Sequence, residues 1–379
     1  MLFCSEHYPH KQNQVPALPS TKPLTTRFNE IELLIAKTIE YLAVPSVVGH
    51  EFIFMDHLEQ DFKNLGLTTK KYKGALEISG KTPLSAIVCA HIDRHGLIST
   101  GDGEYAYAAQ YIREQKYGEP NPQSKNELFK IATRFEGEQV YAYDDSTGKK
   151  LGEGTIHTCF HQMENGDSVF NVNEMDHAKE GTALAYSRMA YYKDNNLSGQ
   201  IDNTISIGTV YALFKNGFQG TALLTCEEEI GKSWLHITEV LDKKKIQTQN
   251  LVVIDTSPFN DDTEIKEGPV VFRSRDFRET FNDEMLDEFK QRAGALEIPF
   301  IVKDDYLINR GKTTEQLGST ELGRLIKHRE RQWSGSTVQI PTLAYHTSYE
   351  TTSKTAILNY YAFLHNILVE WPMNFANRT

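Results

Sequence analysis

The sequence has little of what several common protein classes require. It has four cysteines, and they are widely scattered with no Cys-x-x-Cys spacing, which argues against a zinc finger or a disulfide framework. No apolar run approaches the roughly 18 residues of a membrane span. Positive charge is also scarce, with 40 Lys and Arg against 51 Asp and Glu and a formal net charge of −11. A nucleic-acid partner calls for a basic face, so this balance disfavours one.

The N-terminal residues add a further absence. Met1 to Pro23 is polar and holds no apolar h-region, so we expect no secretory signal. Together with the scattered cysteines, this favours a cytoplasmic location. Residues 1–25, rich in proline and polar residues, are typical of a loosely held arm. At 379 residues the chain exceeds a usual single core, which predicts two domains.

The most informative feature that is present is a run of three carboxylates. Glu227, Glu228 and Glu229 follow the short apolar run 223–226, which is typical of a buried strand. In open α/β sheets functional groups collect where strands end. Three adjacent anions repel one another unless cations lie nearby, although a solvated acidic turn is the alternative.

Other apolar runs end in the same way. The run 85–90 is followed by His91 and Asp93, which can lie on the same side of a strand end. The run 251–254 ends in Asp255, and the run 340–345 ends in His346. Asp202 precedes an apolar-periodic segment at 205–214, where capping of a helix is the alternative to a metal site.

Taken together, these residues predict a metal centre. The candidate ligands are two imidazoles and three carboxylates: His91, Asp202, Glu229, Asp255 and His346. Such a set suits borderline divalent metals, with zinc favoured and cobalt or manganese as alternatives. Three negative charges match two divalent ions with a bridging hydroxide, and two ions about 3.5–4 Å apart can bind that hydroxide and a substrate carbonyl together. Glu228 is then available as the general base, and Asp93 as the carboxylate that orients His91.

The remaining patterns predict the elements around this centre. Helices are expected over 28–42, 51–65, 279–295 and 354–369 and at 318–323, and strands over 75–78 and 298–302. Residues 101–186 carry short alternating runs separated by turn signals, which indicates a small β domain inserted into a catalytic α/β domain of residues 1–100 and 187–379. His157 and His161 lie in a strand-like run, so we interpret them as structural and not as a metal pair.

The motifs resemble a known family in their order along the chain. Ala90-His91-Ile92-Asp93, Asp202-Asn203, Glu228-Glu229-Ile230-Gly231, Asp255 and Tyr345-His346 with Glu350 resemble the tetrahedral (TET) aminopeptidases. These are cytosolic dinuclear metallopeptidases, grouped with glutamyl aminopeptidases and with proteins once labelled endoglucanases. Gly318-Ser319-Thr320-Glu321 also resembles the Gly-Thr-Asp turn near that family's site.

The resemblance implies a fold and a set of roles. The fold is a mixed-sheet phosphorylase/hydrolase-like α/β domain with helices on both faces, plus a small inserted β-barrel (PDZ-like) that helps subunits assemble. Asp202 would bridge two metals, with His91 and Asp255 completing one site and Glu229 and His346 the other. Glu227 would be structural or a secondary substrate contact.

Three positions depart from the family pattern. Arg94 stands where the family usually has Glu, Asn203 stands where it usually has a second Asp, and the Glu pair lacks the usual glycine-rich turn after it. Arg94 is therefore expected to bring a cation near the centre and to affect substrate choice or metal affinity.

The predicted activity is that of a metallo-aminopeptidase. It would remove the N-terminal residue from short peptides, whose cationic terminus the anionic site favours. We expect a homo-oligomer between a dimer and a dodecamer, with no membrane partner. A deacylase on the same scaffold and a non-catalytic binding protein are the alternatives. A glycosidase would leave the two histidines without a role.

Overall fold

A computed structural model describes most of the chain. The described residues are 27–119, 125–158, 169–175, 178–246, 250–328, 333–370 and 372. The predicted N-terminal arm, Cys4, Cys159 and His161 lie outside them. Cys89 and Cys226 are buried free thiols.

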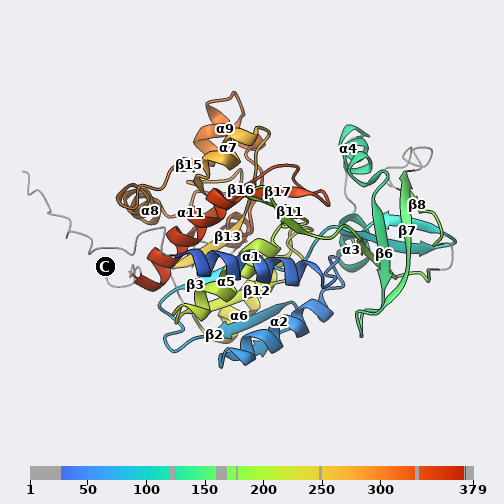
Figure 1. The fold of residues 1–379 in the computed structure, drawn as a ribbon, viewed down its shortest axis with the longest axis horizontal. Helices are drawn as coiled ribbons and strands as arrows, with labels where there is room; N and C mark the ends of the chain where they lie inside the picture. Colours follow the sequence, from blue (N-terminus) through green and yellow to red (C-terminus); the bar gives the residue numbers. More distant parts are fainter. Residues whose placement is uncertain are drawn as a thin grey trace, which may run out of the picture.

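An eight-stranded mixed sheet forms the centre of the larger part of the molecule (Figure 1). In spatial order its strands are β1 (Thr68–Lys71), β2 (Ala75–Ser79), β12 (Thr221–Thr225), β3 (Ile87–His91), β13 (Leu251–Pro258), β16 (Gly335–Thr342), β14 (Val270–Phe272) and β15 (Phe300–Val302). The neighbours β12, β3, β13 and β16 pair in parallel. The carboxyl ends of these strands therefore meet at one edge, where open α/β sheets place their ligands.

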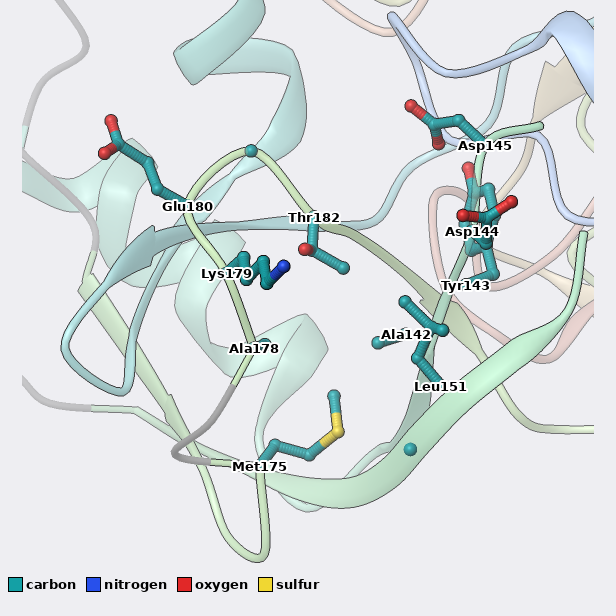
Figure 2. A pocket seen from close by; sticks show the side chains of 12 residues that line it. Ala142, Tyr143, Asp144, Asp145, Leu151, Met175, Ala178, Lys179, Glu180 and Thr182 are labelled. Carbon is teal, nitrogen blue, oxygen red and sulfur yellow. The ribbon is translucent and has the colours of Figure 1, made fainter.

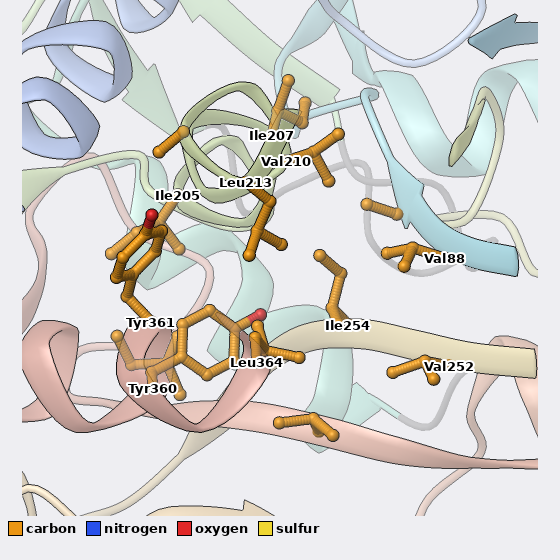
Figure 3. Packing of buried hydrophobic residues seen from close by; sticks show 14 of the residues in the cluster. Val88, Ile205, Ile207, Val210, Leu213, Val252, Ile254, Tyr360, Tyr361 and Leu364 are labelled. Atoms are coloured by element: carbon orange, nitrogen blue, oxygen red, sulfur yellow. The ribbon is translucent and has the colours of Figure 1, made fainter. Parts of the chain in front are cut away.

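Helices cover both faces of this sheet, as predicted. The helices on one face are α1 (Phe28–Leu42), α2 (Phe52–Asn64), α5 (Thr204–Lys215), α8 (Asp283–Ala295) and α11 (Lys354–His365), followed by a π-helical turn at Asn366–Glu370. Figure 3 shows α5 and α11 directing Leu213 and Leu364 toward Val88 of β3 and Ile254 of β13. The other face is covered by α6 (Ser233–Lys243) and α10 (Glu321–His328), which pack on the alternate strand residues such as Cys89. Side chains alternate between the faces of a strand, so each face buries its own apolar set.

The observed boundaries of helices and strands can be compared with the predicted ones. The predicted helix 28–42 is confirmed with the same bounds as α1. The helix predicted from residue 279 begins only at Asp283, because the side chain of Asn282 accepts a hydrogen bond from the amide of Met285 and caps α8. β13 runs three residues beyond Asp255 to Pro258, so the strand does not end where its apolar run ends.

A closed six-stranded barrel lies at the other end of the molecule (Figure 1). In order around the barrel its strands are β4 (Leu97–Gly101), β5 (Glu104–Tyr107), β8 (Val169–Val172), β7 (Lys150–Thr158), β6 (Gln139–Tyr143) and β9 (Ala183–Tyr186). Two helices that the sequence patterns did not predict also lie here: α3 (Ala108–Tyr117) and α4 (Lys125–Phe135). The barrel has its own apolar core, which includes Tyr105, Val140 and Phe170.

Smaller elements complete the fold. A three-stranded sheet joins β10 (Tyr191–Lys193), β11 (Asn196–Gly199) and β17 (Glu350–Ser353), and the short helices are α7 (Asp262–Glu267), α9 (Lys303–Ile308) and a 3₁₀ turn at Thr314–Gln316. None of the helices in the described part of the chain is long and apolar enough to cross a membrane.

Candidate metal centre

Three of the predicted ligands form one group at the carboxyl edge of the sheet. His91 ends β3, Asp255 lies in β13, and Asp202 lies two residues before α5. Nε2 of His91 is 3.3 Å from Oδ1 of Asp202 and 3.5 Å from Oδ1 of Asp255. These three residues can each offer one ligand atom to a single ion.

A second group faces the other oxygen of Asp202. Nε2 of His346, four residues after β16, is 3.5 Å from Oδ2 of Asp202 and 3.7 Å from Oε2 of Glu229. The structure adds His95, which was not among the predicted residues, with Nε2 3.0 Å from the same Oε2 of Glu229. His95, Glu229 and His346 form the second set of residues able to hold an ion.

The carboxylate of Asp202 joins the two groups. Both of its carboxylate oxygens are buried without a hydrogen-bond partner among the described residues. Its alternative role as a helix cap is wrong, because Asn203 occupies the N-cap position of α5 and neither carboxylate oxygen of Asp202 accepts a hydrogen bond within the described residues. A buried carboxylate without partners is costly unless a cation neutralises it.

The separations between these side chains fit metal coordination. Two ligands held tetrahedrally at about 2.0–2.1 Å from one ion lie roughly 3.3 Å apart. The nitrogen–oxygen distances around Asp202 and Glu229 range from 3.0 to 3.7 Å. The residues therefore fit two divalent ions that share Asp202.

The electrostatics of the groups point the same way. Burial, helped by the charge of the neighbouring Asp202, raises the pKa of Glu229 to about 8 against the opposing effect of His346. Burial and the nearby Asp202 also raise the pKa of Asp255, although His91 opposes them. Divalent cations would reverse both shifts, since they favour the ionised carboxylates.

Two further carboxylates fix the backbone around the centre. The carboxylate of Asp93 accepts hydrogen bonds from the amides of Glu228 and Glu229, both at 2.9 Å. Its Oδ1 is 3.6 Å from Nδ1 of His91, while its backbone oxygen is nearer to that nitrogen, at 3.1 Å. Glu350 likewise accepts from the amides of Asp202, at 2.8 Å, and His346, at 2.6 Å. Asp93 and Glu350 therefore tie together loops that follow different strands.

Glu228 lies beside the two groups without belonging to either. Its Oε1 accepts a hydrogen bond of 2.7 Å from the guanidinium of Arg324 on α10. Burial raises the pKa of Glu228 well above its ordinary value, against the effect of Arg324. A carboxylate with a raised pKa is suited to take up a proton.

Glu227 faces away from the metal groups and joins two parts of the molecule. It is bound by Lys116 and Tyr117 of α3, the tyrosine at 2.5 Å, and by His236 of α6 at 3.0 Å. Burial alone would raise the pKa of Glu227, but these hydrogen bonds lower it to about 2. Three adjacent carboxylates thus have three different surroundings.

The departures from the family pattern leave the ligands in place. The guanidinium of Arg94 donates to the backbone oxygens of Leu42 and Val44, at the end of α1. Its charge also interacts with that of Glu350. Asn203 is buried and donates to the backbone oxygen of Ile254 at 2.8 Å. The peptide bond between Asp202 and Asn203 is cis.

A cavity of about 290 Å³ opens beside the second group. It is lined by His95, Glu229 and His346 together with Arg113 of α3 and Lys130 and Arg134 of α4. A larger cavity of about 600 Å³ lies in the barrel between Met175, Leu151 and Asp144 and contains no predicted ligand (Figure 2). We therefore place the candidate substrate site at the smaller cavity.

Some of the site residues that were not predicted had a signal in the sequence, and others had none. His95 continues the alternation of His91 and Asp93 at the end of β3, so its position in the sequence did hold a signal. Arg134 approaches Nδ1 of His346 to 3.5 Å across 212 residues of sequence, and Arg324 reaches Glu228 across 96. No local pattern marks those two pairs.

Comparisons with known proteins find the same architecture in solved structures. No protein-family model matches the sequence, and no curated protein matches it significantly. A TET aminopeptidase from a marine sediment archaeon of the Thaumarchaeota has a TM-score of 0.68 at 14% identity, over 92% of this chain and 98% of that one. The chain has the fold of the TET aminopeptidases. The fold that the motifs implied is thereby confirmed.

Two further solved structures are similar to this chain over nearly their whole length. An aminopeptidase from the archaeon Desulfurococcus kamchatkensis has a TM-score of 0.67 at 14% identity, over 92% of this chain and 98% of that one. The TET1 peptidase of Pyrococcus horikoshii, which can assemble into a tetrahedron or a large octahedral shell, has a TM-score of 0.64 at 14% identity, over 89% and 99%. The similarity therefore includes both the sheet and the barrel.

Proposed function

We propose that this chain is a dinuclear metal-dependent aminopeptidase that removes the N-terminal residue from short peptides. The observation that carries the proposal is the carboxylate of Asp202, which is buried without a hydrogen-bond partner in the described part of the chain and faces one ligand group with each oxygen. Asp202 would be shared by both metal sites. His91 and Asp255 complete one site, and Glu229 and His346 complete the other.

The chemistry divides between the ions and the chain. His91, Asp202, Glu229, Asp255 and His346 would hold two divalent ions, with zinc favoured and cobalt or manganese as alternatives, and the ions would supply Lewis-acid chemistry that activates water and the scissile carbonyl. Glu228 takes the proton of the attacking water and passes it to the leaving amine. Because Arg324 holds Oε1 of Glu228 at 2.7 Å, Oε2 is the atom available for that proton. The carboxylate of Asp93 positions Glu228 by accepting a hydrogen bond from the backbone amide of Glu228. It also lies beside Nδ1 of His91, where it orients the imidazole.

Assembly and location follow from the same proposal. The structures with this fold include a dodecamer and a tetrahedral or octahedral shell. We assign residues 101–186 to a barrel domain that serves assembly, within a catalytic domain of residues 1–100 and 187–379, and propose a homo-oligomer. The buried free thiols Cys89 and Cys226 agree with a reducing cytoplasm.

The decisive experiment pairs metal content with hydrolysis. The purified protein should hold about two ions per chain and hydrolyse amino-acid amides, with activity lost to a chelator and restored by metal. Glu228→Gln should abolish turnover and still bind both ions, whereas retained turnover would refute Glu228 as the base. Hydrolysis of N-acylated but not free-amine substrates would indicate a deacylase instead. Metal-free protein without turnover would refute the proposal.

A further inference from the structure

We infer that His95 is an additional ligand of the second metal site, so that this site holds two imidazoles where the first holds one. The inference rests on the proposed dinuclear centre and adds to it a residue that none of the motifs includes. His95 lies four residues after His91, just beyond β3. Its side chain is 4% exposed.

The position of Nε2 carries the argument. Nε2 of His95 lies 3.0 Å from Oε2 of Glu229, yet it is buried and makes no hydrogen bond within the described part of the chain. Oε1 of Glu229 is likewise without a hydrogen-bond partner there. Ligands of one metal ion are placed in this way: they lie close together without a hydrogen bond between them.

The other side of the ring fixes its orientation. Nδ1 of His95 is 2.7 Å from Oη of Tyr107, the last residue of β5. With its proton on Nδ1, donated to that oxygen, the imidazole keeps a lone pair on Nε2. A metal-binding histidine is usually held in this way through its other nitrogen. Gln200, two residues before the bridging Asp202, also donates to the backbone oxygen of His95 at 2.8 Å.

His95 and His346 form a pair at the second site. Their ring centroids are 4.1 Å apart and the rings are tilted by 66°, so the edges converge and do not stack. The first site has the single imidazole of His91 beside Asp202 and Asp255. A nitrogen-rich site prefers zinc, cobalt or nickel over manganese more strongly than a carboxylate-rich one. The two sites should therefore differ in metal preference, with the second more selective for zinc.

Metal titration of the chelated protein tests the inference. His95→Phe keeps a ring against Tyr107 and removes both nitrogens, and His95→Asn serves as a second variant in case the first does not fold. We expect the Zn²⁺ of the second site to bind more than about 100-fold more weakly in both variants, because losing only the partners that orient a ligand already costs 10- to 100-fold in affinity. Tyr107→Phe should weaken the same step by roughly tenfold. His157→Phe, at a half-exposed strand position of the barrel, is the matched control and should leave both steps unchanged.

The spectrum of bound Co²⁺ gives a readout that does not depend on activity. In the wild type each of the two equivalents should produce ligand-field bands. The bands of the site that holds His95 should shift in His95→Phe, while those of the other site stay in place. If both variants bind two ions with wild-type affinity and unchanged bands, the inference is wrong while the dinuclear centre stands. If the wild type binds no ion, the proposed function fails together with it.

Discussion

Glu227 offers a sharp test of how one carboxylate of the triplet differs from its neighbours. Replacing it with Gln keeps the shape of the side chain and removes the charge that Lys116, Tyr117 and His236 surround. The pKa of Glu227 falls to about 2 from an ordinary 4.5. The folded state therefore favours the ionised form, and neutralising it should destabilise the protein.

The size of the destabilisation follows from the difference between the pKa of Glu227 in the folded protein and its ordinary pKa. At 1.36 kcal/mol per pKa unit, it corresponds to roughly 3 kcal/mol of folding free energy at neutral pH. The side chain of Glu227 is 2% exposed but that of Lys116 is 40% exposed, so solvent screening reduces the figure to roughly 2–3 kcal/mol. For a chain of 379 residues, this loss lowers Tm by about 3 °C.

The pH dependence gives the prediction its sign. A depressed pKa stabilises the fold above the unfolded value, and that contribution disappears as pH falls from about 4.5 toward 2. Thermal unfolding of chelated wild type and Glu227→Gln should thus differ at pH 7 and converge at the acid end. Glu228→Gln is the adjacent control with the opposite sign, because burial raises the pKa of Glu228 and its neutral form is favoured. Equal Tm values for wild type and Glu227→Gln at pH 7 would refute the reasoning.

Three other substitutions, one of them with a matched control, test further parts of the structure. Asp93→Asn offers one acceptor where two amides donate, so metal affinity measured by titration should fall about 10- to 100-fold; an unchanged Kd would remove Asp93 from its supporting role. In Gly323→Ala the new Cβ would lie 2.0 Å from Oδ2 of Asp276, so denaturant unfolding should show a loss of about 1–3 kcal/mol in the free energy of unfolding. The control Gly294→Ala has open space at an exposed position of α8 and should be neutral or stabilising. Burial and the charge of Asp93 raise the pKa of Glu51 well above its ordinary value, so stability is lost as pH rises above about 4.5, and Glu51→Gln should raise Tm at pH 8 but not at pH 4. A constant Tm difference across that pH range would contradict this assignment.

Much of the secondary structure could be predicted from local patterns in the sequence. The helix α1 has the bounds that its apolar periodicity predicts, and β6 occupies the alternating run Gln139–Tyr143. The residues proposed as ligands were also visible, because apolar runs followed by His or Asp lie near the carboxyl ends of parallel strands, although β13 continues past Asp255. A pattern of this kind depends only on neighbours in the chain.

Only the tertiary structure decided how the polar residues divide. The Glu triplet reads as one acidic stretch, yet Glu227 binds α3 and α6, Glu228 binds Arg324 of α10, and Glu229 faces the histidines. Arg94 turns to the end of α1, a contact across about 50 residues of sequence. The charged groups that surround a buried carboxylate come from elements that are distant in the sequence. In the low dielectric of the interior these neighbours determine the pKa and the role of the carboxylate.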